Sequence, residues 1–243
     1  MKPVLIIQQV WHDTPDYFED FLIAQHIPYE IRHMYKGETP PVSLSGYSGY
    51  CMLGGPMSVN DEENFPFLRQ EKELVREALA QDIPMIGHCL GAQLISTALG
   101  GTVSAAPMTE IGWCQINVRD DSAARQWFAG HASVEFFQWH NETFTIPEQG
   151  RLIAGSAHCA NQAFVIGELH IGMQFHCEVK QHKVQHWATQ EKADIDAVLH
   201  LPSVQSSESI VASLPERIPR SNALAHGIYS RWLRSITAWV TPV

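Results

Sequence analysis

Short apolar runs alternate with amphipathic stretches along the first 100 residues. The run 4–9, for example, begins with four consecutive apolar residues, which is typical of parallel strands buried on both faces. Stretches such as 66–81 collect their apolar residues on one helical face and their charges elsewhere. The pattern predicts strands at 4–9, 28–34, 49–56 and 83–87, and helices at 13–25, 66–81 and 90–101. Such alternation predicts a parallel sheet with helices on both faces.

The pattern changes after residue 102, where strand-like runs follow one another with few helical stretches between them. These runs lie at 114–118, 133–140, 151–157, 162–167 and 170–178. We expect them to extend the same sheet and to add a smaller second sheet.

The end of the chain is helical in pattern again. We predict helices at 180–199 and 221–240, separated by Pro- and Ser-rich loops at 201–209 and 214–219. The expected fold is therefore an α/β three-layer sandwich around a mostly parallel, flavodoxin-like sheet, with added β-strands and C-terminal helices. We expect one domain over 1–195 and a helical extension over 196–243 that packs on the same domain.

Composition narrows the function classes. The chain has 16 basic and 26 acidic residues, a formal charge of -10 and no Lys/Arg run, so we expect no nucleic-acid partner. Its first apolar run is too short to cross a membrane and lacks a small-residue cleavage site, so we expect no membrane association and a cytoplasmic protein. Five scattered cysteines, without a CxxC pair, indicate reduced thiols.

One of these cysteines has the setting of a nucleophile. Cys89, in "IPMIGHCLGAQ", lies where a predicted strand meets a predicted helix, with Gly87 and Gly91 two residues away on either side. This is the thiol version of the G-x-S-x-G elbow, which lifts a nucleophile out of the carboxyl end of a strand. A helix N-terminus favours the thiolate, but most of the activation has to come from a charged partner such as imidazolium.

Two histidines are candidates for that partner. His88 is adjacent in sequence, but successive side chains of a strand point to opposite faces, so it should point away from the sulfur. His176 and Glu178, in "MQFHCE", are two apart on a predicted strand and should share a face. A carboxylate beside a histidine orients the ring and stabilises its charged form, which favours His176 as the base.

Three motifs in order resemble one enzyme family. "GHCLGAQ", "MQFHCE" and "LGGPMSVND" resemble the nucleophile, closing and oxyanion-loop motifs of class I (triad) glutamine amidotransferases. "EIGW" and "NQAF" resemble stretches of the stand-alone subgroup related to the amidotransferase domain of GMP synthase. The resemblance covers about residues 1–180. It implies that Cys89 is the nucleophile, His176 the base and acid, and Glu178 the orienting residue.

The resemblance also assigns residues around the triad. The backbone N–H groups of Gly55 and Leu90 would form the oxyanion hole, and Gln93 would lie near the substrate. "FQWHNETF" resembles the family's S-H-G-D-like stretch, which makes Trp139 and His140 candidate substrate-binding residues.

The chain departs from the family pattern at three places. Asn141 and Glu142 replace a glycine and an aspartate near the substrate, Cys177 replaces the proline of the closing motif, and His88 replaces an aliphatic residue. The first departure leaves the amino-acid selectivity open. Cys177 should face away from the reaction.

We expect no cofactor and no metal. His182 and His186 have a metal-compatible spacing, but the H-E-x-x-H glutamate is missing, and no phosphate-binding motif is present. The substrate would be glutamine or another γ-glutamyl compound. Because no synthetase half is present, the ammonia acceptor would be a separate synthetase chain, and a homodimer is left open. A glutaminase-type amidotransferase, a γ-glutamyl peptidase or hydrolase, and a catalytically quiet binding protein are the three functions to distinguish.

Overall fold

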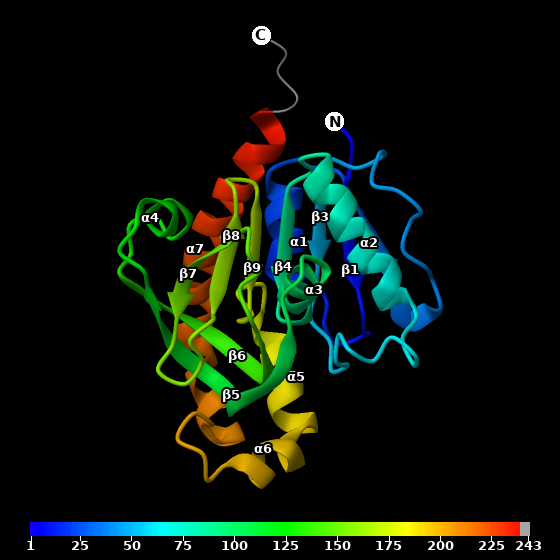
Figure 1. Ribbon diagram of the computed structural model, residues 1–243. Coiled ribbons are helices and arrows are strands. Elements are labelled where there is room, and N and C mark those ends of the chain that lie inside the picture. Colours follow the sequence, from blue (N-terminus) through cyan, green and yellow to red (C-terminus); the bar gives the residue numbers. More distant parts are fainter. Residues whose placement is uncertain (239–243) are drawn as a thin grey trace.

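The described residues of the chain, 1–238 of this computed structural model, contain one nine-stranded sheet (Figure 1). Its strand order is β2-β1-β3-β4-β9-β8-β7-β5-β6. The strands are β1 (Val4–Gln8), β2 (Tyr29–His33), β3 (Gly49–Met52), β4 (Met85–His88), β5 (Val103–Val118), β6 (Ser133–Phe144), β7 (Gly150–Gly155), β8 (Ala163–Ile166) and β9 (His170–Met173). The helices are α1 (Asp16–Ala24), α2 (Phe67–Ala80), α3 (Leu90–Ala98), α4 (Ser122–Trp127), α5 (Gln181–Gln190), α6 (Lys192–Val198) and α7 (Ser207–Ala238), with a 3-10 turn at Met34–Lys36.

The sheet has a parallel half and an antiparallel half. Strands β2, β1, β3, β4 and β9 pair in parallel, and β8, β7, β5 and β6 continue the sheet antiparallel. The expected extension of the sheet is therefore confirmed. The expected second sheet is wrong within the described residues, because β5 pairs with both β6 and β7 and keeps all the late strands in one sheet.

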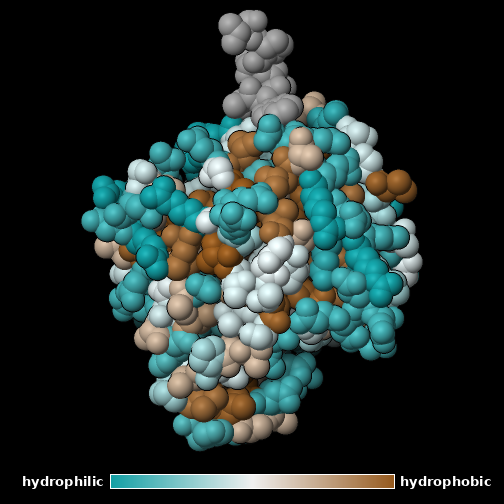
Figure 2. Space-filling model, viewed as in Figure 1, coloured by the Kyte–Doolittle hydropathy of each residue, from teal (hydrophilic) through white to brown (hydrophobic). Residues whose placement is uncertain are grey.

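Alternation along β1 divides the core into two layers. Val4 and Ile6 pack in a cluster with residues of α1, α4 and α7, while Leu5 and Ile7 pack on the other face with residues of α2 and α3. All four side chains are fully buried, as expected for a strand covered on both faces. The predicted three-layer α/β sandwich is confirmed (Figure 1). Figure 2 shows hydrophilic side chains along the outer surface of α2, the face that its amphipathic pattern leaves to solvent.

The C-terminal helix is longer than the sequence pattern predicts. The predicted loop at 214–219 is wrong, because α7 runs without interruption through Pro215 and Pro219. A proline inside a helix costs about 3 kcal/mol, and burial of Ile210, Leu214 and Ile218 in a third apolar cluster with α5, β5 and β6 offsets this cost. The last two residues of the predicted helix at 221–240 lie outside the described residues.

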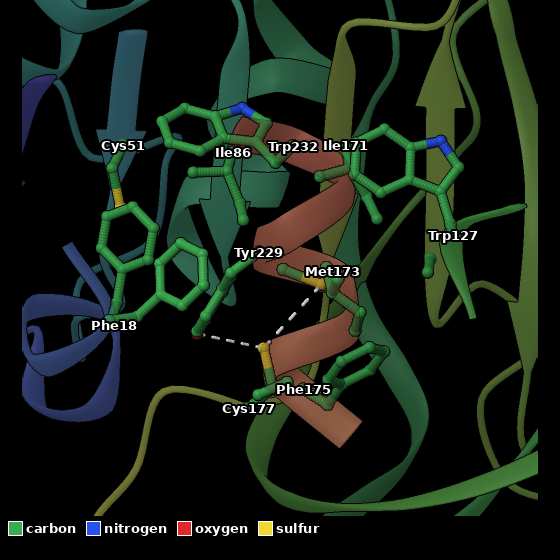
Figure 3. Close-up of a cluster of buried hydrophobic side chains, with 14 of the residues drawn as sticks. Phe18, Cys51, Ile86, Trp127, Ile171, Met173, Phe175, Cys177, Tyr229 and Trp232 are labelled. Carbon is green, nitrogen blue, oxygen red and sulfur yellow. Dashed lines mark hydrogen bonds between the residues drawn. The ribbon is translucent and has the colours of Figure 1, made fainter. Parts of the chain in front are cut away.

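The second half of α7 packs on the sheet itself. Tyr229 and Trp232 are fully buried beside Phe18 of α1, with ring centroids 4.9 and 5.7 Å from that ring. This segment fills the layer behind β4 and β9 (Figure 3). A domain boundary between residues 195 and 196 stays a prediction.

Two further expectations concern membrane spans and the state of the cysteines. Within residues 1–238, no helix combines the length and the apolar character that crossing a membrane requires. The five cysteines are free thiols, which agrees with their scattered spacing.

Candidate active site

The parallel strands end at one edge of the sheet, and the segments that follow β1, β3, β4 and β9 meet there. They enclose a pocket of about 380 Å³ together with β6, α5 and α6. Open α/β sheets bind ligands at this edge. The pocket is lined by Val10, His12, Asp13, Gly55, Pro56, Cys89, Trp139, His176, Trp187, Glu191 and Asp194.

Cys89 forms the turn between β4 and α3. Its backbone has φ 50° and ψ -107°, in the left-handed half of φ space that a non-glycine residue rarely adopts. Its N–H donates to the Met173 carbonyl oxygen at 2.8 Å, so the neighbouring strand β9 holds the turn in place. The predicted strand–turn–helix bend is therefore present, and it delivers the sulfur to the pocket.

The two flanking glycines are required by close packing. A Cβ on Gly87 would lie 2.5 Å from the backbone carbon of Gly91, and a Cβ on Gly91 would overlap the Met52 carbonyl group of β3. The helix thus leaves the strand so tightly that neither position has space for a side chain.

His176 and Glu178 lie on a loop after β9. The prediction of a strand through residue 178 is wrong, because β9 ends at Met173. The loop is nevertheless fixed, since the His176 N–H donates to the Phe137 carbonyl oxygen of β6 at 2.8 Å. His176 Nδ1 lies 2.8 Å from Glu178 Oε1, and both side chains are buried. The expected histidine–carboxylate pair is thus formed without a regular strand.

The electrostatics of this pair favour a charged imidazole. Burial alone would lower the pKa of His176, but the Glu178 carboxylate and the Cys89 side chain raise it well above its ordinary value. Burial would likewise raise the pKa of Glu178, but the charges of Lys183 and His176 hold it well below its usual range. An imidazolium beside a carboxylate and a thiol is the arrangement that stabilises a thiolate.

Two glutamines stand behind the sulfur. Gln174 Nε2 lies 3.5 Å from Cys89 Sγ, and its Oε1 accepts from Gln93 Nε2 at 3.3 Å. Both side chains are buried and neither lines the pocket. The Gln93 N–H donates to the Cys89 carbonyl oxygen at 3.2 Å, while the Gln93 side chain is linked to the Cys89 sulfur through Gln174. A contact between Gln93 and the substrate stays a prediction.

Gly55 lines the pocket, and Leu90 lies directly beside Gly55. A Cβ on Gly55 would lie 3.2 Å from Leu90 Cδ2 and 2.6 Å from Met57 Sδ. The adjacent Gly54 is closer still to the candidate catalytic residues, because a Cβ there would lie 2.9 Å from His176 Cε1. The loop after β3 therefore brings its backbone, without side chains, against Cys89 and His176.

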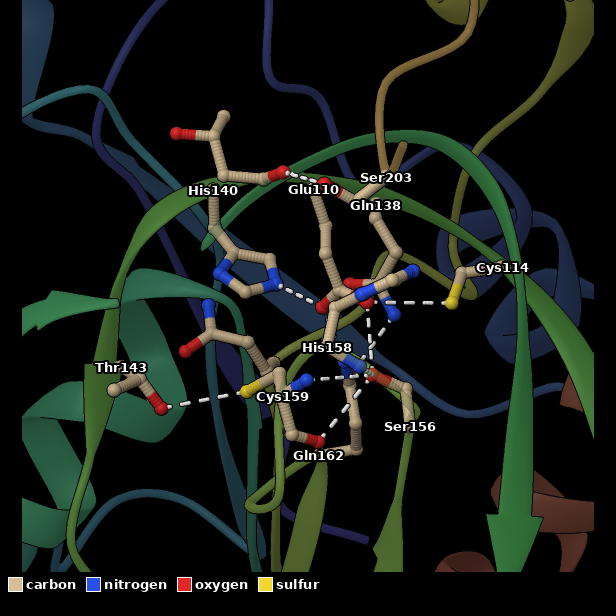
Figure 4. Close-up of polar contacts among 12 residues, drawn as sticks. Glu110, Cys114, Gln138, His140, Thr143, Ser156, His158, Cys159, Gln162 and Ser203 are labelled. Atoms are coloured by element: carbon tan, nitrogen blue, oxygen red, sulfur yellow. Dashed lines mark hydrogen bonds and ion pairs between the residues drawn. The ribbon is translucent and has the colours of Figure 1, made fainter. Parts of the chain in front are cut away.

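Trp139 and His140, adjacent on β6, have different surroundings. Trp139 lines the pocket, and its carbonyl oxygen lies 4.0 Å from Cys89 Sγ. His140 is buried outside the pocket, where Nε2 lies 2.9 Å from Glu110 Oε2 and Nδ1 lies 2.9 Å from the Glu142 carbonyl oxygen. Figure 4 shows this separate polar cluster around Glu110. A substrate contact by His140 stays a prediction.

Glu142, one of the residues that depart from the family pattern, contacts the loop after β3. Glu142 Oε1 accepts from the Ser58 hydroxyl at 3.0 Å. Ser58 belongs to the same loop as Gly55, so the carboxylate ties β6 to the loop that borders the pocket.

His88 and Cys177 both face the opposite layer. His88 Nε2 lies 3.2 Å from the Tyr229 hydroxyl oxygen. Figure 3 shows Cys177 beside the same hydroxyl, with Sγ 3.3 Å from its oxygen. Both side chains are fully buried against α7. Burial lowers the pKa of His88 to about 4, so its ring is neutral at pH 7. These positions agree with the expectation that both side chains point away from Cys89.

Several residues around the pocket were not predicted from the sequence. Asp13 and His12 come from the turn after β1, Trp187 and Lys183 from α5, and Gln174 from the closing motif. Only Gln174 had a signal, because it stands inside the quoted motif "MQFHCE". Asp13, His176 and Glu178 are close enough to hold an ion, but their atoms already contact one another or Lys183. The absence of a metal stays an expectation.

Sequence comparisons link the chain to named proteins. Residues 24–192 match the family model "Glutamine amidotransferase class-I". The chain is 31% identical over 179 residues to the glutamine amidotransferase-like protein YfeJ of Salmonella typhimurium, covering 70% of this chain and 74% of YfeJ. It is 34% identical over 147 residues to one subunit of the glutamine-hydrolysing GMP synthase of Saccharolobus solfataricus, covering 58% of this chain and 72% of that relative.

Solved structures give the same relationship in three dimensions. A glutamine amidotransferase from Methylobacillus flagellatus superposes with a TM-score of 0.92 at 39% identity, covering 97% of this chain and 95% of that one. A glutamine amidotransferase from Thermotoga maritima superposes with a TM-score of 0.85 at 27% identity, covering 97% and 98% of the two chains. With the family match extending over 24–192, the chain belongs to the class I glutamine amidotransferase family.

Proposed function

We propose that this protein hydrolyses the side-chain amide of glutamine to glutamate and ammonia. One observation carries the proposal: the turn after β4 and the loop after β9 bring Cys89 and His176 to one pocket, with Glu178 hydrogen-bonded to His176 Nδ1 behind it. Family membership supports amide hydrolysis in general. The names of the GMP synthase subunits describe glutamine hydrolysis by those relatives.

The proposed reaction has two halves. The Cys89 thiolate attacks the side-chain amide carbon, and the resulting oxyanion accepts hydrogen bonds from the N–H groups of Gly55 and Leu90. His176 transfers its proton to the amide nitrogen, the C–N bond breaks, and ammonia leaves a γ-glutamyl thioester. Water then attacks the thioester while His176 takes its proton, which releases glutamate and restores the thiolate. Glu178 holds the ring through Nδ1 in both halves.

Side chains around the sulfur would orient the substrate. Trp139 forms a wall of the pocket beside Cys89. We assign Gln93 the role of holding Gln174, whose amide lies 3.5 Å from the sulfur. His140 would act at a distance, by fixing the backbone of β6 through its two hydrogen bonds.

The ammonia acceptor would be a separate chain. The relatives from Saccharolobus solfataricus and Sulfurisphaera tokodaii are named as subunits of GMP synthases. A synthetase chain that receives ammonia is therefore the partner we propose here.

Glutamate release from glutamine tests the proposal directly. Purified protein should produce glutamate and ammonia in equal amounts, and Cys89→Ser should produce neither. A denaturant-quenched reaction with labelled glutamine should trap label on Cys89. Wild-type protein that binds glutamine without releasing ammonia would contradict the proposal.

The pocket lining favours a second candidate, hydrolysis of a γ-glutamyl conjugate by the same three residues. Three carboxylates, those of Asp13, Glu191 and Asp194, line the pocket, and no Lys or Arg is among its described lining residues. Asp13 is paired with Lys183, so Glu191 and Asp194 supply the charge that attracts a cationic group, and the lining offers no cation for a free carboxylate. A γ-glutamyl amine with a positively charged amine part would fit these walls.

A substrate panel separates the two candidates. Glutamine, neutral γ-glutamyl amides and γ-glutamyl diamines should be compared by kcat/KM, with glutamate and the released amine measured separately. Preference for glutamine supports the first candidate, and preference for the diamine conjugate supports the second. Glu191→Gln and Asp194→Asn should reduce the preference for the cationic conjugate and leave the neutral amides nearly unchanged.

A further inference from the structure

A lysine is buried behind the predicted triad. Lys183 of α5 exposes only 1% of its side chain, and lysine is almost never buried unless its charge is paired. Its Nζ lies 2.8 Å from Asp13 Oδ1, 3.3 Å from Glu178 Oε1 and 3.9 Å from Asp16 Oδ2, and it donates to the Thr14 carbonyl oxygen at 2.5 Å. The ammonium thus joins three carboxylates that come from two separate parts of the chain.

Glu178 depends on this ammonium for its orientation. Its Oε1 is shared between His176 Nδ1 and Lys183 Nζ, while its buried Oε2 has no hydrogen-bond partner among the described residues. The two contacts to Oε1 are therefore what fixes the carboxylate. Lys183 also holds Asp13, which forms part of the pocket wall.

We propose that Lys183 is a positioning residue of the reaction: it keeps Glu178 ionised and oriented toward His176. The inference rests on the proposed function, in which Glu178 orients the base. Lys183 lies behind the carboxylate and does not line the pocket, so it acts through Glu178 and not on the substrate.

The charges around Lys183 set the direction of its effect. Three carboxylates face the Lys183 ammonium, those of Asp13, Asp16 and Glu178. Its charge also acts on four further titratable side chains, those of His12, His88, Cys51 and Cys177. Burial favours the protonated form of Glu178, and the Lys183 charge is the largest influence that opposes it. Removing the cation stabilises the protonated form of Glu178, so the pKa of Glu178 rises.

The pH dependence of Cys89 alkylation tests this role without a substrate. In Lys183→Met, the acid limb of the iodoacetamide reaction should move to higher pH by about 1 pH unit, and the acid limb of γ-glutamyl amide hydrolysis should move with it. Lys180→Met is the matched control, because Lys180 pairs with Asp20 at the protein surface. Lys183→Arg keeps the positive charge. The acid limb of its alkylation profile should therefore stay at the wild-type pH, even where the hydrolysis rate is lower.

Thermal unfolding separates positioning from a purely structural role. Lys183→Met with lower stability but a wild-type alkylation limb would overturn the inference. Lys183→Met leaves three buried carboxylates without their cation and can fail to fold for that reason. In that case the double variant Lys183→Met/Asp16→Asn is compared with Asp16→Asn alone, which repeats the test with one buried carboxylate fewer. If the wild-type protein hydrolyses no γ-glutamyl amide, the proposed function fails, while the alkylation profile still decides the role of Lys183.

Discussion

His88 and Tyr229 meet behind the sheet, with Nε2 3.2 Å from the hydroxyl oxygen, although His88 immediately precedes the candidate nucleophile. The contact joins the end of β4 to α7, on the face opposite the pocket. Sequence proximity to Cys89 therefore does not make His88 a base, and it makes this histidine part of the packing between the sheet and the C-terminal helix.

Replacing His88 and His176 by alanine, one at a time, distinguishes a packing role from a catalytic role. His88→Ala should lower the free energy of unfolding by about 1–3 kcal/mol, because it removes a buried side chain, while turnover per folded molecule stays close to wild type. His176→Ala should lower kcat by about a hundredfold or more. Denaturant unfolding and steady-state kinetics on both variants check this. Loss of turnover in His88→Ala with retention in His176→Ala would reverse the assignment.

Backbone strain at Cys89 predicts a stability difference between two inactive variants. Cys89→Ala keeps a Cβ at φ 50°, whereas Cys89→Gly relieves the strain. We expect Cys89→Gly to be more stable than Cys89→Ala by about 1 kcal/mol or more. Urea titration of the two proteins measures the difference. A Cys89→Gly protein that is less stable than Cys89→Ala by about 0.5–1 kcal/mol, the entropic cost of glycine, would show that the turn carries no strain.

A methyl group on the loop after β3 should disable the site without unfolding the protein. In Gly54→Ala the new Cβ would meet His176 Cε1 at 2.9 Å and overlap Asp13 Oδ2, so the imidazole has to shift. We expect hydrolysis to fall sharply and the circular dichroism spectrum to stay unchanged. Gly46→Ala is the control, since a Cβ there meets nothing within 4 Å. Full activity in Gly54→Ala would mean that His176 is not held where we describe it.

The buried, neutral His88 should make stability depend on pH. Its folded-state pKa is about 4, below the ordinary value of about 6.5, so the unfolded chain binds the proton more readily. The contribution of this histidine is complete above about pH 6.5 and is lost as the pH falls toward 4, by at most about 3 kcal/mol. His88→Gln should flatten the stability curve in that range, whereas His131→Gln, at an exposed position, should leave it unchanged. Equal curves for wild type and His88→Gln would refute this account.

The parallel half of the sheet was predictable because burial on both faces leaves a local signature. Val4–Gln8 and Met85–His88 are apolar runs bounded by turns, and the Gly87 and Gly91 spacing marked the bend at Cys89. The motif order likewise indicated that Cys89 and His176 belong to one site.

The errors arose where tertiary contacts outweigh local preference. Pro215 and Pro219 usually end helices, but distant strands bury the residues around them. β9 ends at Met173, and His176 pairs with the sheet only through an isolated antiparallel bridge to Phe137 of β6, a long-range contact that has no local signal in the sequence. Lys183 had no recognisable sequence signal, since Asp13 and Asp16 become its neighbours only when α5 packs against the segment after β1.

The bond from the Cys89 N–H to the Met173 carbonyl oxygen also bears on how the protein matures. β4 and β9 are adjacent in the sheet but distant along the chain, and the strands between them are all placed on the far side of β9. During synthesis the thiol therefore emerges long before the strand that supports it and the loop that carries His176 and Glu178. The site that we propose around Cys89 would then form only when β9 inserts beside β4, as a late step of folding.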